Sequence, residues 1–332
     1  SDLGCCSRHH DAVSSIHRIP MTPYLQDLLD RRFVARLGKR TLDWLCRHED
    51  DFRIARVTTE AVPWRVKPLA ELMFLLTALK RHGLNSPSLT RLSDGALEEG
   101  EKFDWHELAA YDASAATGMA VVADFFQCQG RPAPFEDRFF GFLHQIDYFE
   151  GMDRLPYRDM DLAYNLGRLI STEYEKDIPV WFRSTAFGRR QHIVRYSIDD
   201  IYSLTHAVFY LTDLGLRRPE TLLDPETAGR LRAELATLTG AMLRADNTDV
   251  LGELLLCWLF CGVERRGLNA VIFQHGLHQM MAVETDGSIA PTVRILQQAR
   301  SGKATFGQLY HTTLVGAFLF NLLSEARTYA RN

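Results

Sequence analysis

A single ionisable residue inside an otherwise apolar helical stripe is the feature that most constrains this chain. It occurs in three segments and more loosely in a fourth, which are residues 67–76, 202–210, 249–256 and 310–320. In the first three, Glu71, His206 or Glu253 directly follows a small residue or Thr, and bulky apolar residues come next. Ionised groups are rarely buried unless they are paired or functional. Four such helices in one fold therefore predict a shared polar cavity.

The bulk properties are those of an ordinary globular protein. The chain has 332 residues, of which 46% are hydrophobic and 24% charged, with a net charge of −4. This charge argues against a nucleic-acid partner, because phosphate binding needs a basic surface. The longest apolar run, residues 254–263, is shorter than the roughly 20 residues that span a bilayer. With no apolar leader and no C-x-x-C pair, we expect a cytoplasmic protein without a membrane partner.

Helical periodicity dominates the sequence, and alternating strand patterns are nearly absent. Gly, Pro, Asn and Asp divide the chain into about six helical hairpins that repeat roughly every 45 to 50 residues. We expect residues 1–35 to be a peripheral segment and residues 36–332 to form one all-helical domain. The more apolar second helices are expected at residues 65–82, 105–128, 158–174, 198–214, 248–266 and 307–329.

Repeated helical hairpins either stack into an open solenoid or close into a ring. Six hairpins suit a closed α/α toroid, in which the second helices form an inner ring around a central cavity. Helices that are apolar on all sides are buried, which favours the toroid over the open α-solenoid. The predicted fold is thus all-α, with about six helical hairpins closing into an α/α toroid.

Three segments carry a resemblance to a known group of proteins. Residues 42–45 (Leu-Asp-Trp-Leu), 67–72 and 205–215 are similar to actinobacterial all-helical proteins that are uncharacterised and often associated with natural-product gene clusters. The resemblance implies an all-helical fold and supplies no activity. By architecture alone, the expected toroid resembles the barrels of terpene cyclases, lanthionine cyclases and some glycosidases.

In a toroid the second helices all begin at the same end of the ring, so their first turns converge. Polar residues gather there, with Glu and His on facing helices that can share protons or ligate a metal. The catalytic candidates are Glu71, Tyr202, His206, Glu253 and His311. In the competing interpretation, each polar group is a buried hydrogen-bonding partner that holds neighbouring helices in register.

His206 is the strongest catalytic candidate, because the hydroxyl of Tyr202 lies one turn before it and can orient the imidazole. Asp213 lies two turns beyond His206 and is expected either to meet an Arg of a neighbouring helix or to help end its own helix. Asp249 and Glu253 share a helix face, a spacing that suits cation ligation. Alternatively, Thr248 caps this helix and Asp249 complements its dipole.

The cofactor candidate is a divalent metal ion, with His206, Glu253 and His311 as its candidate ligands. Substrate binding is assigned to residues that carry charge near the expected mouth, which are Lys67, Asp161, Asp249 and Arg195. Arg195 belongs to the compact basic stretch of residues 189–195. Cys5, Cys6, His9 and His10 lie in a segment without order signals, which we expect to be a tail.

The leading functional hypothesis is an enzyme of specialised (natural-product) metabolism that binds a small organic substrate in the central cavity. It would act by acid–base or metal-assisted chemistry on a small molecule or a carrier-bound intermediate. The alternative is a non-catalytic helical-repeat protein that binds a peptide or a carrier protein. A closed ring would bring Glu71, His206, Glu253 and His311 together, whereas an open solenoid would spread them along a groove.

Overall fold

The computed structural model describes residues 31–54, 62–105, 115–135, 145 and 154–325. In this part of the chain the regular structure is twelve α-helices, short 3-10 turns and one antiparallel hairpin of β1 (Glu284–Thr285) and β2 (Ser288–Ile289). The prediction of an all-α fold is confirmed. The expected tail with Cys5, Cys6, His9 and His10 lies outside the described residues.

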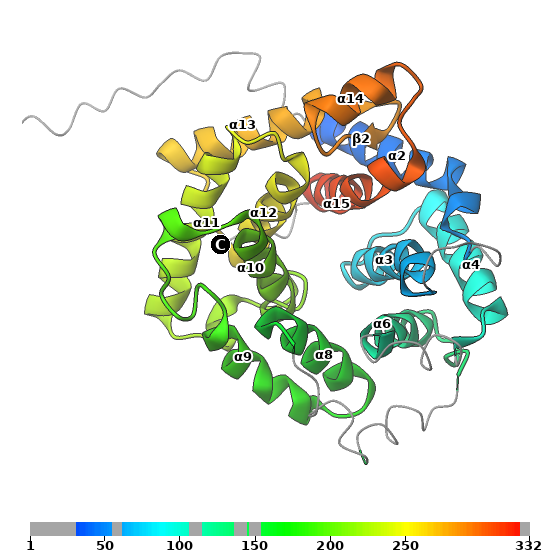
Figure 1. The fold of residues 1–332 in the computed structure, drawn as a ribbon, viewed down its shortest axis with the longest axis horizontal. Coiled ribbons are helices and arrows are strands. Elements are labelled where there is room, and N and C mark those ends of the chain that lie inside the picture. Colours follow the sequence, from blue (N-terminus) through cyan, green and yellow to red (C-terminus); the bar gives the residue numbers. More distant parts are fainter. Residues whose placement is uncertain (1–30, 55–61, 106–114, 136–144, 146–153, 326–332) are drawn as a thin grey trace, which may run out of the picture.

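Six helices lie toward the centre of Figure 1, and each contacts the next in chain order. They are α3 (Val62–Arg81), α6 (Ala115–Cys128), α8 (Pro156–Leu169), α10 (Ile198–Leu211), α12 (Thr248–Cys261) and α15 (Phe306–Ser324). The last of them, α15, also contacts the first, α3. These are the helices expected as second members of the hairpins. These contacts connect the six helices but do not by themselves establish that they close into an α/α toroid.

Six further helices lie at the periphery of Figure 1. They are α2 (Arg31–Arg47), α4 (Pro87–Lys102), α9 (Ile178–Ser184), α11 (Pro225–Met242), α13 (Gly267–Ala282) and α14 (Val293–Arg300). The boundary predicted at residue 35 falls inside α2, where Val34 is already buried. Residues 31–35 thus belong to a helix that packs against α15, and residues 1–30 lie outside the described part of the chain.

The pattern of apolar residues explains which helices lie inside. In α4 the buried residues include Leu89, Leu92 and Ala96, which repeat on one face and leave the other face polar. In α12, by contrast, every residue from Val250 to Cys261 is buried. A helix that is apolar all round has no face to offer to water, so α12 lies between α10, α15 and the outer helices α11 and α13.

Helix caps fix where the inner helices begin. Ser197 and Asp200 form a capping box at the start of α10. The side chain of Asn247 caps α12 by accepting from the Val250 N–H, so the expectation that Thr248 is the cap is wrong. Thr248 is instead the first helical residue and is buried. Asp249 follows in the first turn of α12, where a carboxylate complements the helix dipole.

Glu71, His206, Glu253 and His311 lie in the second or third turn of their helices rather than in the predicted first turns.

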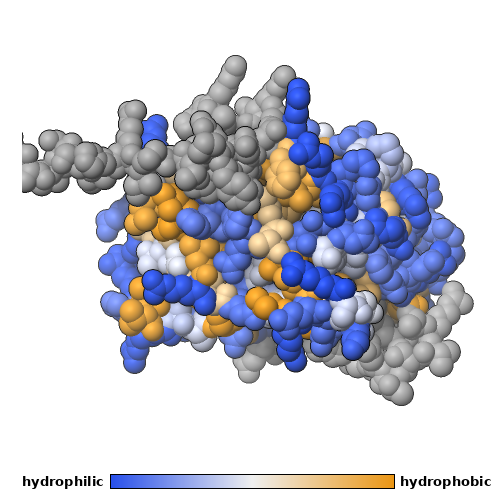
Figure 2. Space-filling model, turned by 90° about the horizontal axis from the view of Figure 1, so that it is seen from above, coloured by the Kyte–Doolittle hydropathy of each residue, from blue (hydrophilic) through white to orange (hydrophobic). Residues whose placement is uncertain are grey.

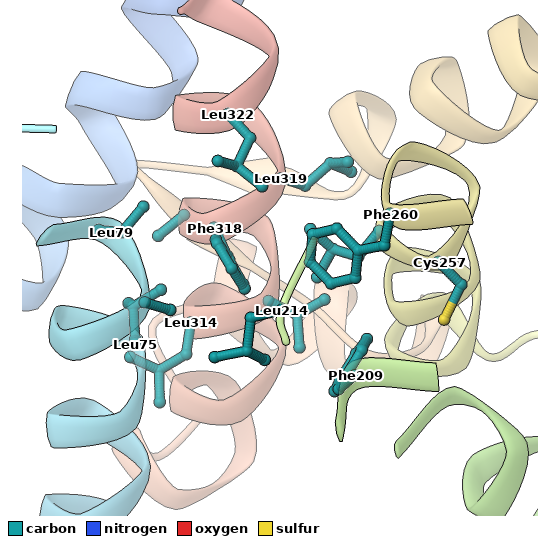
Figure 3. Close-up of a cluster of buried hydrophobic side chains, with 14 of the residues drawn as sticks. Leu75, Leu79, Phe209, Leu214, Cys257, Phe260, Leu314, Phe318, Leu319 and Leu322 are labelled. Atoms are coloured by element: carbon teal, nitrogen blue, oxygen red, sulfur yellow. The ribbon is translucent and has the colours of Figure 1, made fainter. Parts of the chain in front are cut away.

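Following these residues, the four helices carry apolar side chains toward one another. Figure 3 shows Leu75, Phe209, Phe260 and Phe318 converging from α3, α10, α12 and α15. The Phe260 ring centroid lies 5.7 Å from that of Phe209 and 5.6 Å from that of Phe318, and all three rings are buried. These side chains form a packed apolar floor below the four ionisable residues.

On the face drawn in Figure 2, hydrophobic residues form separate groups among hydrophilic ones. Among the residues that the structure describes, no helix combines the length and the apolar character that crossing a bilayer requires.

Candidate functional site

The ionisable residues of four inner helices meet above the apolar floor. Glu71 comes from α3, His206 from α10, Glu253 from α12 and His311 from α15. His311 lies 3.2 Å from Glu71 and 3.6 Å from Glu253, and His206 lies 3.6 Å from Glu253, measured between nitrogen and carboxylate oxygen. The structure therefore brings four of the predicted catalytic residues into one continuous group.

His311 is at the centre of this group. Its Nδ1 is 3.2 Å from Oε2 of Glu71. Its Nε2 faces two carboxylates, at 3.6 Å from Oδ2 of Asp249 and 3.6 Å from Oε1 of Glu253. Both 3.6 Å contacts are ion pairs beyond hydrogen-bonding distance, and the buried Nε2 forms no hydrogen bond with any residue that the structure describes. We call the four residues Glu71, Asp249, Glu253 and His311 the His311 cluster.

The two carboxylates that face Nε2 are held from behind by threonines. Thr312 donates a hydrogen bond of 2.8 Å to Oδ1 of Asp249, and Thr205 donates one of 2.5 Å to Oε2 of Glu253. Each bond occupies one carboxylate oxygen and leaves the other toward His311. Sequence reasoning missed the anchoring role of both threonines, because the partner of each lies on another helix.

His206 contacts the cluster from the side of α10. Its Nδ1 lies 2.9 Å from the carbonyl oxygen of Tyr202, which can only accept, so Nδ1 carries the proton. In the described part of the chain the hydrogen bonds of His206 all involve Nδ1, which leaves Nε2 as a basic nitrogen. The imidazole packs against the Tyr202 ring, with centroids 4.0 Å apart and the planes tilted by 37°. Tyr202 thus contacts His206 through its ring and its carbonyl rather than through its hydroxyl.

The exposed fraction of the side chains increases from a buried carboxylate at the base of the cluster to its solvent-exposed rim. The side chain of Glu253 is 1% exposed, that of His206 15% and that of His311 28%. Lys67 lies at the rim, 45% exposed, with its Nζ 3.6 Å from Oε1 of Glu71. The outer side chains of the cluster are therefore partly exposed, while Glu253 at its base is buried.

The charges in the cluster act on one another strongly. Burial opposes protonation of His311, but Asp249 and Glu71 overcome it and raise the pKa of the imidazole well above its ordinary value. Burial also works against ionisation of Glu71, yet the neighbouring His311 lowers the pKa of that carboxyl. The pKa of Asp249 is raised, chiefly by burial and further by Glu253. The positive charge of a protonated His311 therefore faces three carboxylates, Glu71 at Nδ1 and Asp249 and Glu253 at Nε2.

Two predicted substrate-binding residues lie away from the cluster. Asp161 is buried in α8, where Oδ1 accepts a hydrogen bond from Asn165 and Oδ2 lies 3.5 Å from Nη1 of Arg158. Arg195 is exposed in a 3-10 turn, and no ion pair among the described residues joins it to the cluster. Sequence reasoning overlooked Arg158, since a basic residue near a helix start carries no distinctive pattern.

Three side chains offer a set of potential metal ligands, and the set differs from the predicted one. Asp249, Glu253 and His311 each present one ligand atom, and these atoms lie within 4.8 Å of one another. His206 was predicted as a ligand, but it is not one of the three residues whose ligand atoms lie this close together. Asp249, predicted to bind substrate, takes the third place because it shares a helix face with Glu253.

The spacing of the ligand atoms suits a transition metal ion. An ion about 2.1 Å from each atom of a tetrahedral site separates the ligand atoms by about 3.4 Å. The observed separations of 3.6 Å from His311 Nε2 to both carboxylates are close to this value. Two carboxylates and one imidazole suit Zn²⁺, Mn²⁺ or Fe²⁺. Glu71 then takes the position of the outer carboxylate that commonly orients a metal-bound histidine.

Comparison with known proteins gives one match. A family model described as a domain of unknown function (DUF6895) matches residues 38–320. No curated protein and no solved structure matches the chain. The expected link to actinobacterial natural-product gene clusters stays a prediction.

Proposed function

We propose that this chain, which belongs to the DUF6895 family, is an enzyme that binds a divalent metal ion through Asp249, Glu253 and His311. The ion would assist acid–base chemistry on a small organic substrate at the polar end of the inner helices. In this proposal the helices close into an α/α toroid, which the contact of α15 with α3 supports.

The observation that carries the proposal is that one atom from each of Asp249, Glu253 and His311 faces the same point. The second oxygen or nitrogen of each side chain already has a partner elsewhere. Thr312 holds the other oxygen of Asp249, Thr205 holds that of Glu253, and Glu71 lies against the other nitrogen of His311. Nε2 of His311 lies 3.6 Å from one oxygen of Asp249 and one of Glu253, and the three atoms are close enough together for one ion to contact all of them.

The charge balance of the site also favours a cation. Three carboxylates (Glu71, Asp249 and Glu253) face the imidazolium of His311 and the ammonium of Lys67. A divalent ion that displaces the proton from His311 adds one positive charge and neutralises the group. Removing such charges from water is costly unless they are compensated, so metal binding stabilises this arrangement.

The neighbouring side chains can move protons at a bound substrate. An ion held by Asp249, Glu253 and His311 would supply Lewis-acid chemistry, polarising a substrate oxygen or acidifying a water. His206 has a free Nε2 and serves as the general base. Burial and the charge of Glu253 raise the pKa of Tyr202, so its phenol remains protonated at neutral pH and can donate a hydrogen bond. Lys67 lies at the rim beside Glu71, where it can meet substrate charge.

The proposal is tested by titrating the metal-stripped, tag-free protein with Mn²⁺ and Zn²⁺ by calorimetry, in wild type and His311→Gln. His275→Gln is the matched control, because His275 is an exposed histidine on α13. We expect one tight site in the wild type, the same site in the control and at least about 100-fold weaker binding in His311→Gln. A folded wild type that binds neither metal would overturn the metal site and leave a binding or structural role.

A further inference from the structure

A basic and aromatic group lies beside the His311 cluster, on the side of α8 and α10. The guanidinium of Arg158 lies over the ring of Tyr157, 5.0 Å from its centroid. The Tyr157 ring in turn lies 5.8 Å from the imidazole of His206 and 6.4 Å from the ring of Tyr202. Continuous contacts therefore connect Arg158 to His206, which itself contacts Glu253 of the cluster.

Two arginines and two aspartates carry the charges on this side of the site. Arg158 contacts Asp161 at 3.5 Å, and Arg154 acts on both Asp161 and Asp159. Burial raises the pKa of Asp161, which favours its neutral form. The buried carboxyl group of Asp161 therefore only partly balances the charge of Arg158.

Arg158 is also accessible to a ligand. Its side chain is 51% exposed, while Tyr157 beneath it is buried and holds it in place. An arginine that stacks on an aromatic ring keeps its fork of N–H donors free to meet a planar carboxylate or a phosphate. Arg158 thus combines a fixed position, exposure and proximity to His206.

We propose that Arg158 binds an anionic group of the substrate, a carboxylate or a phosphate, while the reacting end of the same molecule lies at His206 and the cation of Asp249, Glu253 and His311. This inference rests on the proposed function and narrows its substrate class to small organic anions. The sequence pattern predicts that Arg195 pairs with substrate charge. This inference assigns that role to Arg158 instead.

The test measures anion binding to the Mn²⁺-loaded and the metal-free protein, with succinate and inorganic phosphate as separate probes. Wild type, Arg158→Gln and the control Arg195→Gln are compared by calorimetry at low salt. We expect one of the two anions to bind, and we expect its affinity to be the same for wild type and for Arg195→Gln. Arg158→Gln should bind it at least about tenfold more weakly, since a charge-assisted hydrogen bond is lost. The probe that binds identifies the group as carboxylate or phosphate.

The outcomes separate this inference from the proposed function. Mn²⁺ affinity is measured independently for each variant and should be the same in Arg158→Gln as in wild type. If Mn²⁺ binds but neither anion does, or if Arg158→Gln binds the anion as well as wild type, the inference is overturned and the metal site stands. If Mn²⁺ does not bind, the proposed function fails, while a loss of anion binding in metal-free Arg158→Gln still supports the arginine site.

Discussion

Two polar groups occupy opposite ends of the inner helices and are built differently. The His311 cluster lies above the apolar floor, and the second group lies below it, at the C-terminal end of α3. There Arg81 donates hydrogen bonds of 2.7 Å to the Tyr164 hydroxyl and 2.5 Å to Oδ2 of Asp213. Tyr164 donates to Oδ1 of Asp213 at 2.8 Å, which completes a closed triangle that we call the Arg81 network.

The difference lies in how completely each group is paired. In the Arg81 network one cation meets one carboxylate, and both carboxylate oxygens accept hydrogen bonds. In the His311 cluster the carboxylates outnumber the cations, and Nε2 of His311 lies in two ion pairs without a hydrogen bond to any described residue. Glu71 and Arg81 belong to the same helix and lie about 15 Å apart. Burial of charge alone thus does not distinguish the two groups. The proposed site is the group in which charges from several helices converge and are incompletely paired.

The largest effect expected from this difference is on metal affinity. Glu253→Gln removes a ligand charge but keeps the hydrogen bond from Thr205, so the fold should survive while Mn²⁺ affinity falls more than about 100-fold. Asp213→Asn removes a carboxylate of the Arg81 network and should leave Mn²⁺ affinity unchanged. Titration followed by Mn²⁺ electron paramagnetic resonance measures both. Equal losses in the two variants would contradict the distinction.

A smaller effect is expected from the residue that orients His311. Glu71→Gln retains a side chain that can accept from Nδ1 but removes the charge behind the imidazole. Metal affinity should therefore fall by about 10- to 100-fold, the range for outer partners of metal ligands. The same titration measures it. An unchanged affinity would show that Glu71 pairs with Lys67 and does not support the metal site.

The raised pKa of His311 predicts a pH dependence. Below that pKa the metal must displace a proton, so affinity should rise about tenfold per pH unit and then level off above it. Calorimetry in buffers of different ionisation enthalpy should detect one released proton per ion at pH 7. Release of no proton at this pH would contradict a protonated His311 in the metal-free protein.

The stability of the metal-free protein should show the matching trend. A raised folded-state pKa adds stability that is full below the ordinary histidine pKa and lost as pH rises through the folded value. The metal-free wild type should therefore become less stable above about pH 7. His311→Gln should lack this contribution, and thermal unfolding across this pH range would check it.

The smallest effect concerns the Arg81 network. Asp213 has a φ of 49°, a left-handed conformation that Asn tolerates well, so Asp213→Asn tests charge rather than backbone strain. We expect it to lower the free energy of unfolding by about 1 to 2 kcal/mol, between the values for exposed and buried ion pairs. Urea unfolding of the metal-free protein measures this loss. An unchanged free energy of unfolding would show that this ion pair does not stabilise the fold.

Much of this arrangement could be predicted from the sequence, because helical periodicity and caps are local properties. The apolar second helices lie toward the centre, and the expectation that Asp213 meets an Arg of a neighbouring helix is confirmed by Arg81. The interpretation of Asp249 as substrate-binding missed its grouping with Glu253 and His311. Which faces of α12 and α15 meet depends on the packing of helices far apart in the chain, and that register is not a local property.

The same reason explains the residues that were missed. Thr205 and Thr312 serve as anchors only through carboxylates on another helix. Arg158 lies over Tyr157, whose ring is next to His206, and this connection depends on the packing of α8 against α10. Arg195, in the more conspicuous basic stretch, lies exposed. A sequence pattern thus identified the helices that carry the site, and the partners across the helix interfaces required the structure.

The most direct test of the central claim is an anomalous difference map from crystals of the protein soaked in Mn²⁺. The account predicts a peak among Oδ2 of Asp249, Oε1 of Glu253 and Nε2 of His311, about 2.1 Å from each, with Glu71 still against Nδ1. Well-ordered side chains with no peak among them, or a peak only elsewhere on the surface, would contradict it.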